Sequence, residues 1–209
     1  MNWMDMSLSE FESALASGDA TPGGGTAAAV ALGQAAALTQ MVCKLTLGKE
    51  KWERGWESAQ LAQKVAEMVI QRAGGLANED SEAFDLVVSA FKLPKATEED
   101  KQHRRAAIRS GTLKAAEVPL ETAELGMELL SVLEGLALHG NGNAASDVGV
   151  ASLLASASVK GALFNVEINV ASLPESMSEA VVLSSSGMRE QCSEISRKVM
   201  HAVHDRIRS

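Results

Sequence analysis

Apolar residues recur at the three- and four-residue spacing of α-helices along most of the chain, and alanine, leucine, glutamate and lysine dominate the long windows. Aromatic residues are scarce and tyrosine is absent, so the pattern offers little from which to build strands. We therefore expect an all-α fold, a multi-helix bundle of about eight helices without an internal repeat. The expected helices lie at about 7–16, 21–47, 52–73, 78–91, 97–118, 119–139, 144–171 and 175–207.

Caps, glycines and prolines predict the ends of these helices. Thr21 is a suitable N-cap, with Pro22 at the first helical position. The Gly74–Gly75 pair predicts the end of one helix, and Pro119 predicts the start or a kink of another. Pro174 precedes the final amphipathic helix, which we expect to run unbroken to about residue 207.

Small residues cover nearly every side of the expected helix at 26–47 and allow neighbouring backbones to approach closely. This composition suits a central helix or a subunit interface. The most apolar part, Thr26 to Leu38, is shorter than the roughly 20 residues that a membrane span needs. We therefore expect a buried core helix and no membrane insertion.

The bulk properties narrow the class of protein further. The 209 residues contain no polar linker, so we expect residues 1–209 to form a single domain. With 27 acidic and 19 basic residues the formal net charge is −8, which argues against non-specific binding of nucleic acid or of an anionic membrane. Cys43 and Cys192 lie in apolar helical patterns typical of buried thiols in a reducing compartment, and the N-terminus lacks an export signal. These features predict a cytoplasmic protein.

Three glycines follow one another at the start of a helix, in the segment Thr21–Thr26. Each glycine in a helix costs about 0.8–1.0 kcal/mol relative to alanine, so a compensating role is expected. The functional interpretation is a bare helix N-terminus, whose free amides and positive dipole end approach an anionic or carbonyl-bearing ligand. The structural interpretation is tight packing against another helix, and the sequence favours neither.

Asp80 interrupts an apolar face that Leu76, Phe84, Val87 and Phe91 form at helical spacing. A carboxylate that faces the core is desolvated, which raises its pKa towards the range useful in general acid–base catalysis, whereas a neighbouring lysine would lower it. The commoner reason for an acidic residue in a first turn is the helix dipole. The helical period therefore makes Asp80 a candidate base, but on this evidence alone the helix dipole is the commoner explanation for its position.

A polar seam crosses the apolar helix expected at 144–171, and its asparagines can donate and accept hydrogen bonds to a planar heterocycle. A network that only joins helices explains the same pattern. Lysines cluster around the turn at Gly48, and such a cluster in an acidic protein can clamp carboxylates. His201 and His204 lack accompanying acidic or cysteine ligands, so we expect no metal site. The seam consists of Asn143, Asp147, Asn165 and Asn169.

Several more specific segments follow one another along the chain. They are Thr-Pro-Gly-Gly-Gly-Thr (21–26), Lys-Leu-Thr-Leu-Gly-Lys (44–49), Asp-Ser-Glu-Ala-Phe (80–84), Lys-Leu-Pro-Lys (92–95), Val-Pro-Leu (118–120), Gly-Asn-Gly-Asn-Ala-Ala-Ser-Asp-Val-Gly-Val-Ala (140–151) and Asn-Val-Glu-Ile-Asn (165–169). In sequence and in order they closely resemble the family of formiminotetrahydrofolate cyclodeaminases and methenyltetrahydrofolate cyclohydrolases. The resemblance covers nearly the whole chain from Ser7. Two departures are Asn78, where relatives often have a second acidic residue, and Trp52, where a tyrosine is common.

The resemblance implies an all-α homodimer that binds a one-carbon derivative of tetrahydrofolate, with or without a polyglutamate tail, in a cleft near the glycine-rich helix start. It implies Asp80 as the catalytic base, and it implies neither a cofactor nor a metal. The candidate substrate-binding residues on this resemblance are Gly23, Gly24, Gly25, Lys44, Lys49, Asn143, Asp147, Asn165 and Asn169.

Both reactions of that family involve a one-carbon bridge between a ring nitrogen and the linker nitrogen of tetrahydrofolate. In cyclohydrolysis Asp80 would deprotonate the water that attacks the bridge carbon. In cyclodeamination it would take the proton of the linker nitrogen while ammonia leaves, with Lys44 or a bound water as the acid. The chain has no room for a formiminotransferase domain, so we expect the cyclohydrolase. The alternatives are the cyclodeaminase and, from another class, a non-catalytic helical dimer.

Overall fold

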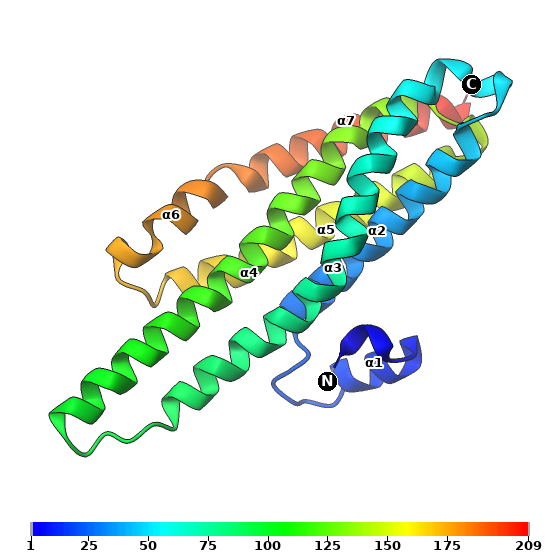
Figure 1. The fold of residues 1–209 in the computed structure, drawn as a ribbon. Coiled ribbons are helices and arrows are strands. Elements are labelled where there is room, and N and C mark those ends of the chain that lie inside the picture. The colour runs from blue at the N-terminus through cyan, green and yellow to red at the C-terminus, as the bar shows by residue number, and fades with distance from the viewer. Residues whose placement is uncertain (1, 209) are drawn as a thin grey trace.

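The computed structural model describes residues 2–208, which form a bundle of helices with no strand among them. The all-α expectation is confirmed. Figure 1 shows the long helices packed roughly along one direction, with the short N-terminal elements beside them. The α-helices are α1 (Leu8–Leu15), α2 (Gly24–Thr46), α3 (Trp56–Phe91), α4 (Glu98–His139), α5 (Ala145–Val170), α6 (Glu175–Ser185) and α7 (Met188–Arg208). The 3-10 helices are η1 (Trp3–Asp5), η2 (Glu50–Gly55) and η3 (Gly142–Ala144).

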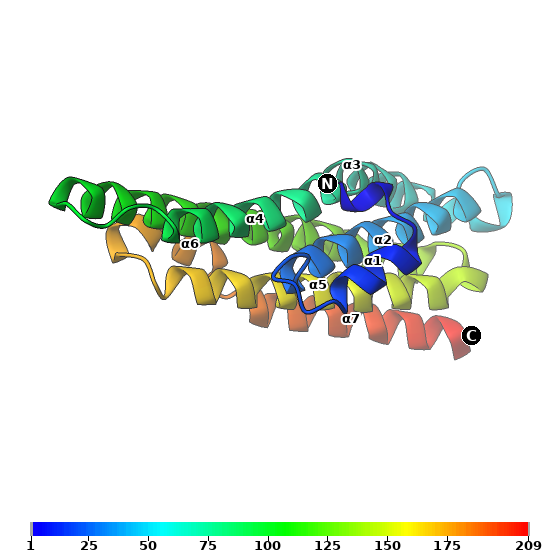
Figure 2. The same cartoon turned by 90° about the horizontal axis from the view of Figure 1, so that it is seen from below.

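The core is built from leucines of α2 and α4 against small residues of the neighbouring helices. Leu32, Leu129, Leu130 and Leu133 are completely buried. Alanines on α2, α3 and α5 are buried with them and let the helix backbones approach closely, as the small-residue pattern predicts. The α3–α4 hairpin extends past the other helices, whereas η1 and α1 lie against the outside of α2, as Figure 2 shows.

Two helices are long and apolar enough to cross a membrane by length and composition alone. They are Gly24–Thr46 and Gly142–Val170, and the search covers the described residues. Half of the apolar window of the first, and 56% of that of the second, is buried inside the bundle. Core helices of soluble proteins pass the same test.

Two predicted helix breaks are absent. The helices expected at 52–73 and 78–91 form the single helix α3, and those expected at 97–118 and 119–139 form α4. Gly74 and Gly75 lie within α3, where a Cβ on Gly74 would come 2.9 Å from Cγ of Met4. The pair therefore admits the N-terminal segment rather than ending the helix. Pro119 lies inside α4 and is buried, so the helix continues through the proline instead of starting at it.

Two further boundaries differ from the expected ones. The final helix is divided into α6 and α7 at Gly187, whose φ of +74° is the left-handed conformation that glycine adopts readily. The N-cap of α2 is Gly23, not Thr21, and Pro22 precedes the helix instead of opening it. The capped start of α1 is confirmed, because Ser7 and Glu10 form a reciprocal capping box.

Candidate functional site

Asp80 lies on α3 and directs its carboxylate at the first turn of α2. The Thr26 hydroxyl donates a hydrogen bond of 3.0 Å to Oδ2 of Asp80. A Cβ placed on Gly25 would lie 2.6 Å from Cγ of Asp80, which is closer than non-bonded carbon atoms approach. Glycine at position 25 is therefore a requirement for the carboxylate to reach the helix end.

The remaining glycines of the motif have different surroundings. Gly23 is the N-cap of α2 and has no side chain with which to cap it. Gly24 is exposed, and a Cβ there would meet no atom within 4 Å. Packing thus accounts for Gly25 alone, while Gly24 leaves the helix start open to a ligand.

Burial raises the pKa of the Asp80 carboxyl above its usual value, and this is the largest influence on it. Hydrogen bonds from the Thr26 hydroxyl and backbone N–H act in the opposite direction, because they stabilise the ionised form. No lysine or arginine is among the causes of the shift. A half-buried carboxylate with a raised pKa is a stronger base than an exposed one, which suits it to accept a proton from a bound water.

Three residues that the sequence analysis did not single out connect Asp80 to the N-terminal segment. Thr26 and Ser81 are buried, and their hydroxyl oxygens lie 3.0 Å apart. The indole N–H of Trp3 donates a hydrogen bond of 3.0 Å to Oγ of Ser81. The only signal in the sequence is that Ser81 directly follows Asp80 and that Thr26 closes the glycine motif.

The N-terminal segment is anchored by Asn78, one of the departures from the family pattern. Oδ1 of Asn78 accepts a hydrogen bond of 2.9 Å from the backbone N–H of Trp3. The amide group of Asn78 donates to the Asn2 side chain at 2.8 Å and to the carbonyl of Gly74 at 3.1 Å. An amide can both donate and accept, as these contacts require, and a carboxylate cannot.

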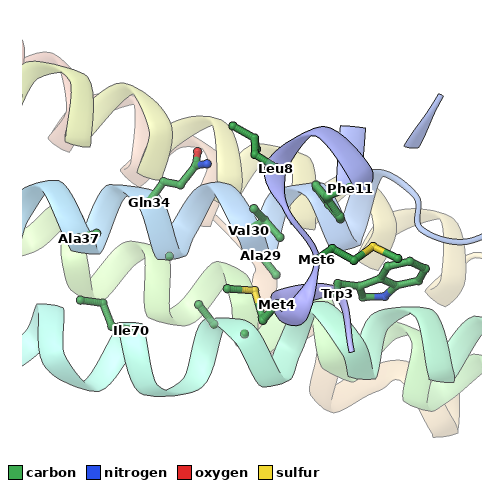
Figure 3. Close-up of a pocket in the computed structure, with 13 residues that line it drawn as sticks. Trp3, Met4, Met6, Leu8, Phe11, Ala29, Val30, Gln34, Ala37 and Ile70 are labelled. Carbon is green, nitrogen blue, oxygen red and sulfur yellow. The ribbon is translucent and has the colours of Figure 1, made fainter. Parts of the chain in front are cut away.

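A cavity of about 380 Å³ lies between this segment, α2 and α3 (Figure 3). Its walls are mostly apolar, and Gln34 supplies a polar side chain at one side. Trp3 lines the cavity and is also the residue bonded to Ser81, so it lies between the cavity and the Asp80 site. Asp80 itself does not line the cavity.

The predicted binding residues divide between the two ends of the bundle. Lys44 lies in the last turn of α2 and Lys49 just after it, and both are exposed. Asn143 and Asp147 lie at the same end, in η3 and the first turn of α5. Since a helix rises 1.5 Å per residue, Lys44 is about 30 Å along α2 from Gly24. One chain therefore does not bring these residues to Asp80.

The profile of the family described as Formiminotransferase-cyclodeaminase matches residues 7–184. The chain belongs to this family. It is 33% identical over 201 residues to a methenyltetrahydrofolate cyclohydrolase of Methylorubrum extorquens. That match covers 96% of this chain and 97% of the relative. It is 35% identical over 175 residues to a formimidoyltransferase-cyclodeaminase of Sus scrofa, and there the match spans 84% of this chain and 32% of the relative.

A solved structure within the formiminotransferase-cyclodeaminase family has the same fold. The crystal structure of a formiminotetrahydrofolate cyclodeaminase from Thermotoga maritima superposes with a TM-score of 0.85 at 27% sequence identity. The match covers 97% of this chain and 98% of that one. The family resemblance read from the ordered motifs is thereby confirmed.

In the present protein Asn165 and Asn169, at the end of the polar seam, make structural contacts. Ser158 donates to the carbonyl of Ala28 at 2.7 Å, which places Asn165, two turns further along α5, at the level of the start of α2. The Asn165 side-chain amide donates to the carbonyl of Gly161 at 3.0 Å. That of Asn169 donates to the carbonyl of Ala115 at 2.9 Å.

The contact of Asn169 explains how α4 tolerates a proline. Residue 119 would normally donate its backbone N–H to the carbonyl of residue 115, four positions earlier, but Pro119 has no N–H to donate. The Asn169 side chain supplies the missing donor to the carbonyl of Ala115. Asn169 is thus satisfied by the fold, as the interhelical interpretation of the seam predicts.

Among the described residues no group of three or more His, Cys, Asp or Glu side chains could hold a metal ion. His201 and His204 are both exposed on α7. Cys43 and Cys192 are buried free thiols, and burial raises the pKa of the Cys43 thiol to about 12. A thiol with so high a pKa is a poor nucleophile at neutral pH.

Proposed function

We propose that this protein is a methenyltetrahydrofolate cyclohydrolase with Asp80 as the base. The observation that carries the proposal is the half-buried carboxylate of Asp80, which has a raised pKa and is held over Gly25 at the start of α2. The Methylorubrum extorquens cyclohydrolase supports it, because that relative matches this chain over nearly its whole length. The substrate is a one-carbon derivative of tetrahydrofolate.

In the proposed reaction Asp80 takes a proton from a water molecule, whose oxygen then attacks the bridge carbon. The bond between the bridge carbon and the ring nitrogen then breaks as a proton is delivered to that nitrogen, and the added hydroxyl loses its proton to become the carbonyl of formyltetrahydrofolate. The open first turn of α2, with the free amides beside Gly24, is suited to bind a carbonyl or carboxylate oxygen of the substrate. The proposed chemistry uses neither a metal nor a covalent intermediate.

The second candidate is formiminotetrahydrofolate cyclodeaminase, and the Thermotoga maritima structure favours it. The same base would take the proton of the linker nitrogen as that nitrogen attacks the formimino carbon, and ammonia would leave with the help of an acid. Lys44, or a bound water, is the proposed acid. Both candidates need a base at the position of Asp80.

We also propose that the functional unit is an antiparallel homodimer. Large apolar side chains on the outer faces of α2 and α5 are exposed, from 39% for Met41 to 75% for Ile168. A two-fold axis across the middle of α2 would cover these faces and reverse the helix direction in the partner. The lysine end of one protomer would then lie beside Asp80 of the other. The exposed apolar residues on α2 and α5 include Met41, Leu45, Val150, Leu153, Phe164 and Ile168.

In that dimer Lys44 and Lys49 would bind the carboxylates of the folate tail, including those of a polyglutamate extension. Asn143 and Asp147 would line the same end of the site. The net charge of −8 supports a localised clamp of this kind rather than a broad basic surface. We propose a cytoplasmic location, in keeping with the two free thiols.

The decisive experiment follows methenyltetrahydrofolate absorbance near neutral pH, against the uncatalysed rate, with wild type, Asp80→Asn and Asp85→Asn. Asp85 is an exposed aspartate on the same helix and serves as the matched control. We expect wild type and Asp85→Asn to accelerate hydrolysis and Asp80→Asn not to. Ammonia release from formiminotetrahydrofolate, with no acceleration of hydrolysis, would establish the cyclodeaminase instead. A folded protein inactive with both substrates would leave the non-catalytic dimer.

A further inference from the structure

The N-terminal segment reaches Asp80 through a continuous line of hydrogen bonds. We call the line of Trp3, Ser81, Thr26 and Asp80 the hydroxyl chain. Its three links, from indole to Ser81, from Ser81 to Thr26 and from Thr26 to Asp80, each measure 3.0 Å. Thr26 is fully buried and Ser81 is 5% exposed, so bulk water does not compete for these groups.

The direction of every link is fixed while Asp80 is ionised. A carboxylate only accepts, so the single hydroxyl proton of Thr26 is used in the bond to Asp80. Ser81 must then donate to Thr26, and Ser81 in turn accepts from the indole N–H, which can only donate. All groups in the chain are satisfied in this one arrangement.

The arrangement is less favourable once Asp80 is protonated. A proton on Oδ1 would leave Thr26 donating to a neutral oxygen, which is a weaker acceptor than a carboxylate. A proton on Oδ2 would make the carboxyl O–H donate to Thr26, and Thr26 would then turn its proton towards Ser81. Ser81 would receive two donors, one from Thr26 and one from Trp3, and its own proton would lose its partner within the chain. The fixed donor at Trp3 therefore favours the direction in which all hydroxyl protons point towards Asp80.

We propose that Trp3 is a positioning residue for Asp80, acting through Ser81 and Thr26 to orient and polarise the hydroxyl chain towards the carboxylate. The inference rests on the proposed role of Asp80 as the base. It assigns to the N-terminal segment a part in the chemistry, beyond covering the apolar cavity on α2 and α3. Trp3 itself does not touch the reacting atoms.

Within one protomer, the charged groups on the elements next to Asp80 do not account for the shift in its pKa. On α3, Glu79 is held by Arg72 of the same helix, and Glu82 is exposed. The first turn of α2 contains no acidic or basic residue. In η1 the titratable residue is Asp5, and none of these groups is among the causes of the shift at Asp80.

The first test measures kcat/KM against pH for wild type, Trp3→Phe, Ser81→Ala and the double variant. Loss of the indole donor should move the acidic limb of the profile to higher pH by roughly half a unit to one unit. Ser81→Ala should give a similar shift, and the double variant should add nothing, because either change cuts the same chain. The control is Phe11→Leu, which alters the edge-to-face packing of Phe11 on Trp3, with ring centroids 6.4 Å apart, and keeps the donor.

The second test needs no catalysis and uses the indole ¹⁵N–¹H resonance of Trp3, assigned by its loss in Trp3→Phe. We expect this resonance to titrate with pH in wild type and to stop titrating in Asp80→Asn and Thr26→Val. Titration that persists in Asp80→Asn would overturn the proposal, as would equal pH profiles for Trp3→Phe and Phe11→Leu. If no folate substrate is turned over, the resonance still decides whether Trp3 is coupled to Asp80.

Discussion

Gly25 lies directly beneath the carboxylate of Asp80, so that a Cβ at position 25 would stand 2.6 Å from Cγ of Asp80. Gly25→Ala should therefore displace the carboxylate from Thr26 while leaving the helix intact. A misplacement of about 1 Å at a catalytic group can reduce the rate on the order of a hundredfold, and we expect a loss of that size in kcat. Steady-state kinetics with the substrate established for the wild type measures it.

Gly24→Ala is the matched control for that variant. A Cβ on Gly24 would meet nothing within 4 Å, and alanine favours a helix over glycine by up to about 1 kcal/mol. We expect Gly24→Ala to unfold at the same or a slightly higher temperature and to keep Asp80 in place. Equal losses of kcat in both variants would mean that the glycines act through the open helix end and not through Asp80.

Asp80→Asn should stabilise the folded protein at neutral pH. Burial raises the pKa of Asp80 in the folded state above its usual value, so ionisation of this residue opposes folding at pH values above that raised pKa. As the pH falls through the raised pKa towards the usual value of 3.8, the wild type regains this stability and the advantage of the variant should shrink. Urea unfolding of both proteins between about pH 7 and pH 4.5 measures the difference. An advantage independent of pH would contradict the assignment.

The sequence predicts helix type well and helix ends poorly, for reasons visible at particular residues. Gly74 and Gly75 read as a stop because a helical glycine is costly, but the structure places Met4 against Gly74. Pro119 reads as a break because its own lost hydrogen bond is visible in the sequence. The donor that compensates it, Asn169, lies 50 residues away and is brought near only by packing.

The candidate site shows the same limit. The helical period correctly suggests a desolvated Asp80 carboxylate, but its reason is only partly right. Leu76 of the predicted apolar face is buried, whereas Phe84 and Phe91 are exposed, and Asp80 is covered by the first turn of α2 instead. Its partners Thr26 and Trp3 come from segments 54 and 77 residues earlier, so no local pattern could pair them with it. The separation of Lys44 from the glycine motif, by contrast, follows from the single helix expected at 21–47. What the sequence does not show is that Asp80 lies at the glycine end of that helix.

The pair of Pro119 and Asn169 can be tested by a double-mutant cycle. Asn169→Ala removes the donor to the carbonyl of Ala115 and should destabilise the protein by about 1–3 kcal/mol. In a Pro119→Ala background the backbone N–H of residue 119 can serve that carbonyl, so the same change should cost clearly less. Denaturant unfolding measures all four proteins. Equal costs in both backgrounds would show that Asn169 does not compensate the proline.

Cys43 should be inert towards thiol reagents in the folded protein. With a pKa of about 12 only about one thiol in ten thousand is ionised at pH 8, and the side chain is fully buried. Cys192 is buried as well, with no exposed surface. Labelling with an aromatic disulfide should therefore follow global unfolding, and fast labelling of either thiol in buffer would show local opening of its helix.

The proposed antiparallel dimer predicts complementation between two impaired chains. If each site combines Asp80 of one protomer with Lys49 of the other, a mixed dimer of Asp80→Asn and Lys49→Ala chains has one site with both defects and one with neither. Random assembly at equal amounts makes half of the dimers mixed, so about a quarter of all sites should be intact. The test co-expresses the two chains with different tags, isolates the mixed dimer and compares its kcat/KM with that of each parent. A mixed dimer no more active than its parents would show that a site does not combine Asp80 of one protomer with Lys49 of the other.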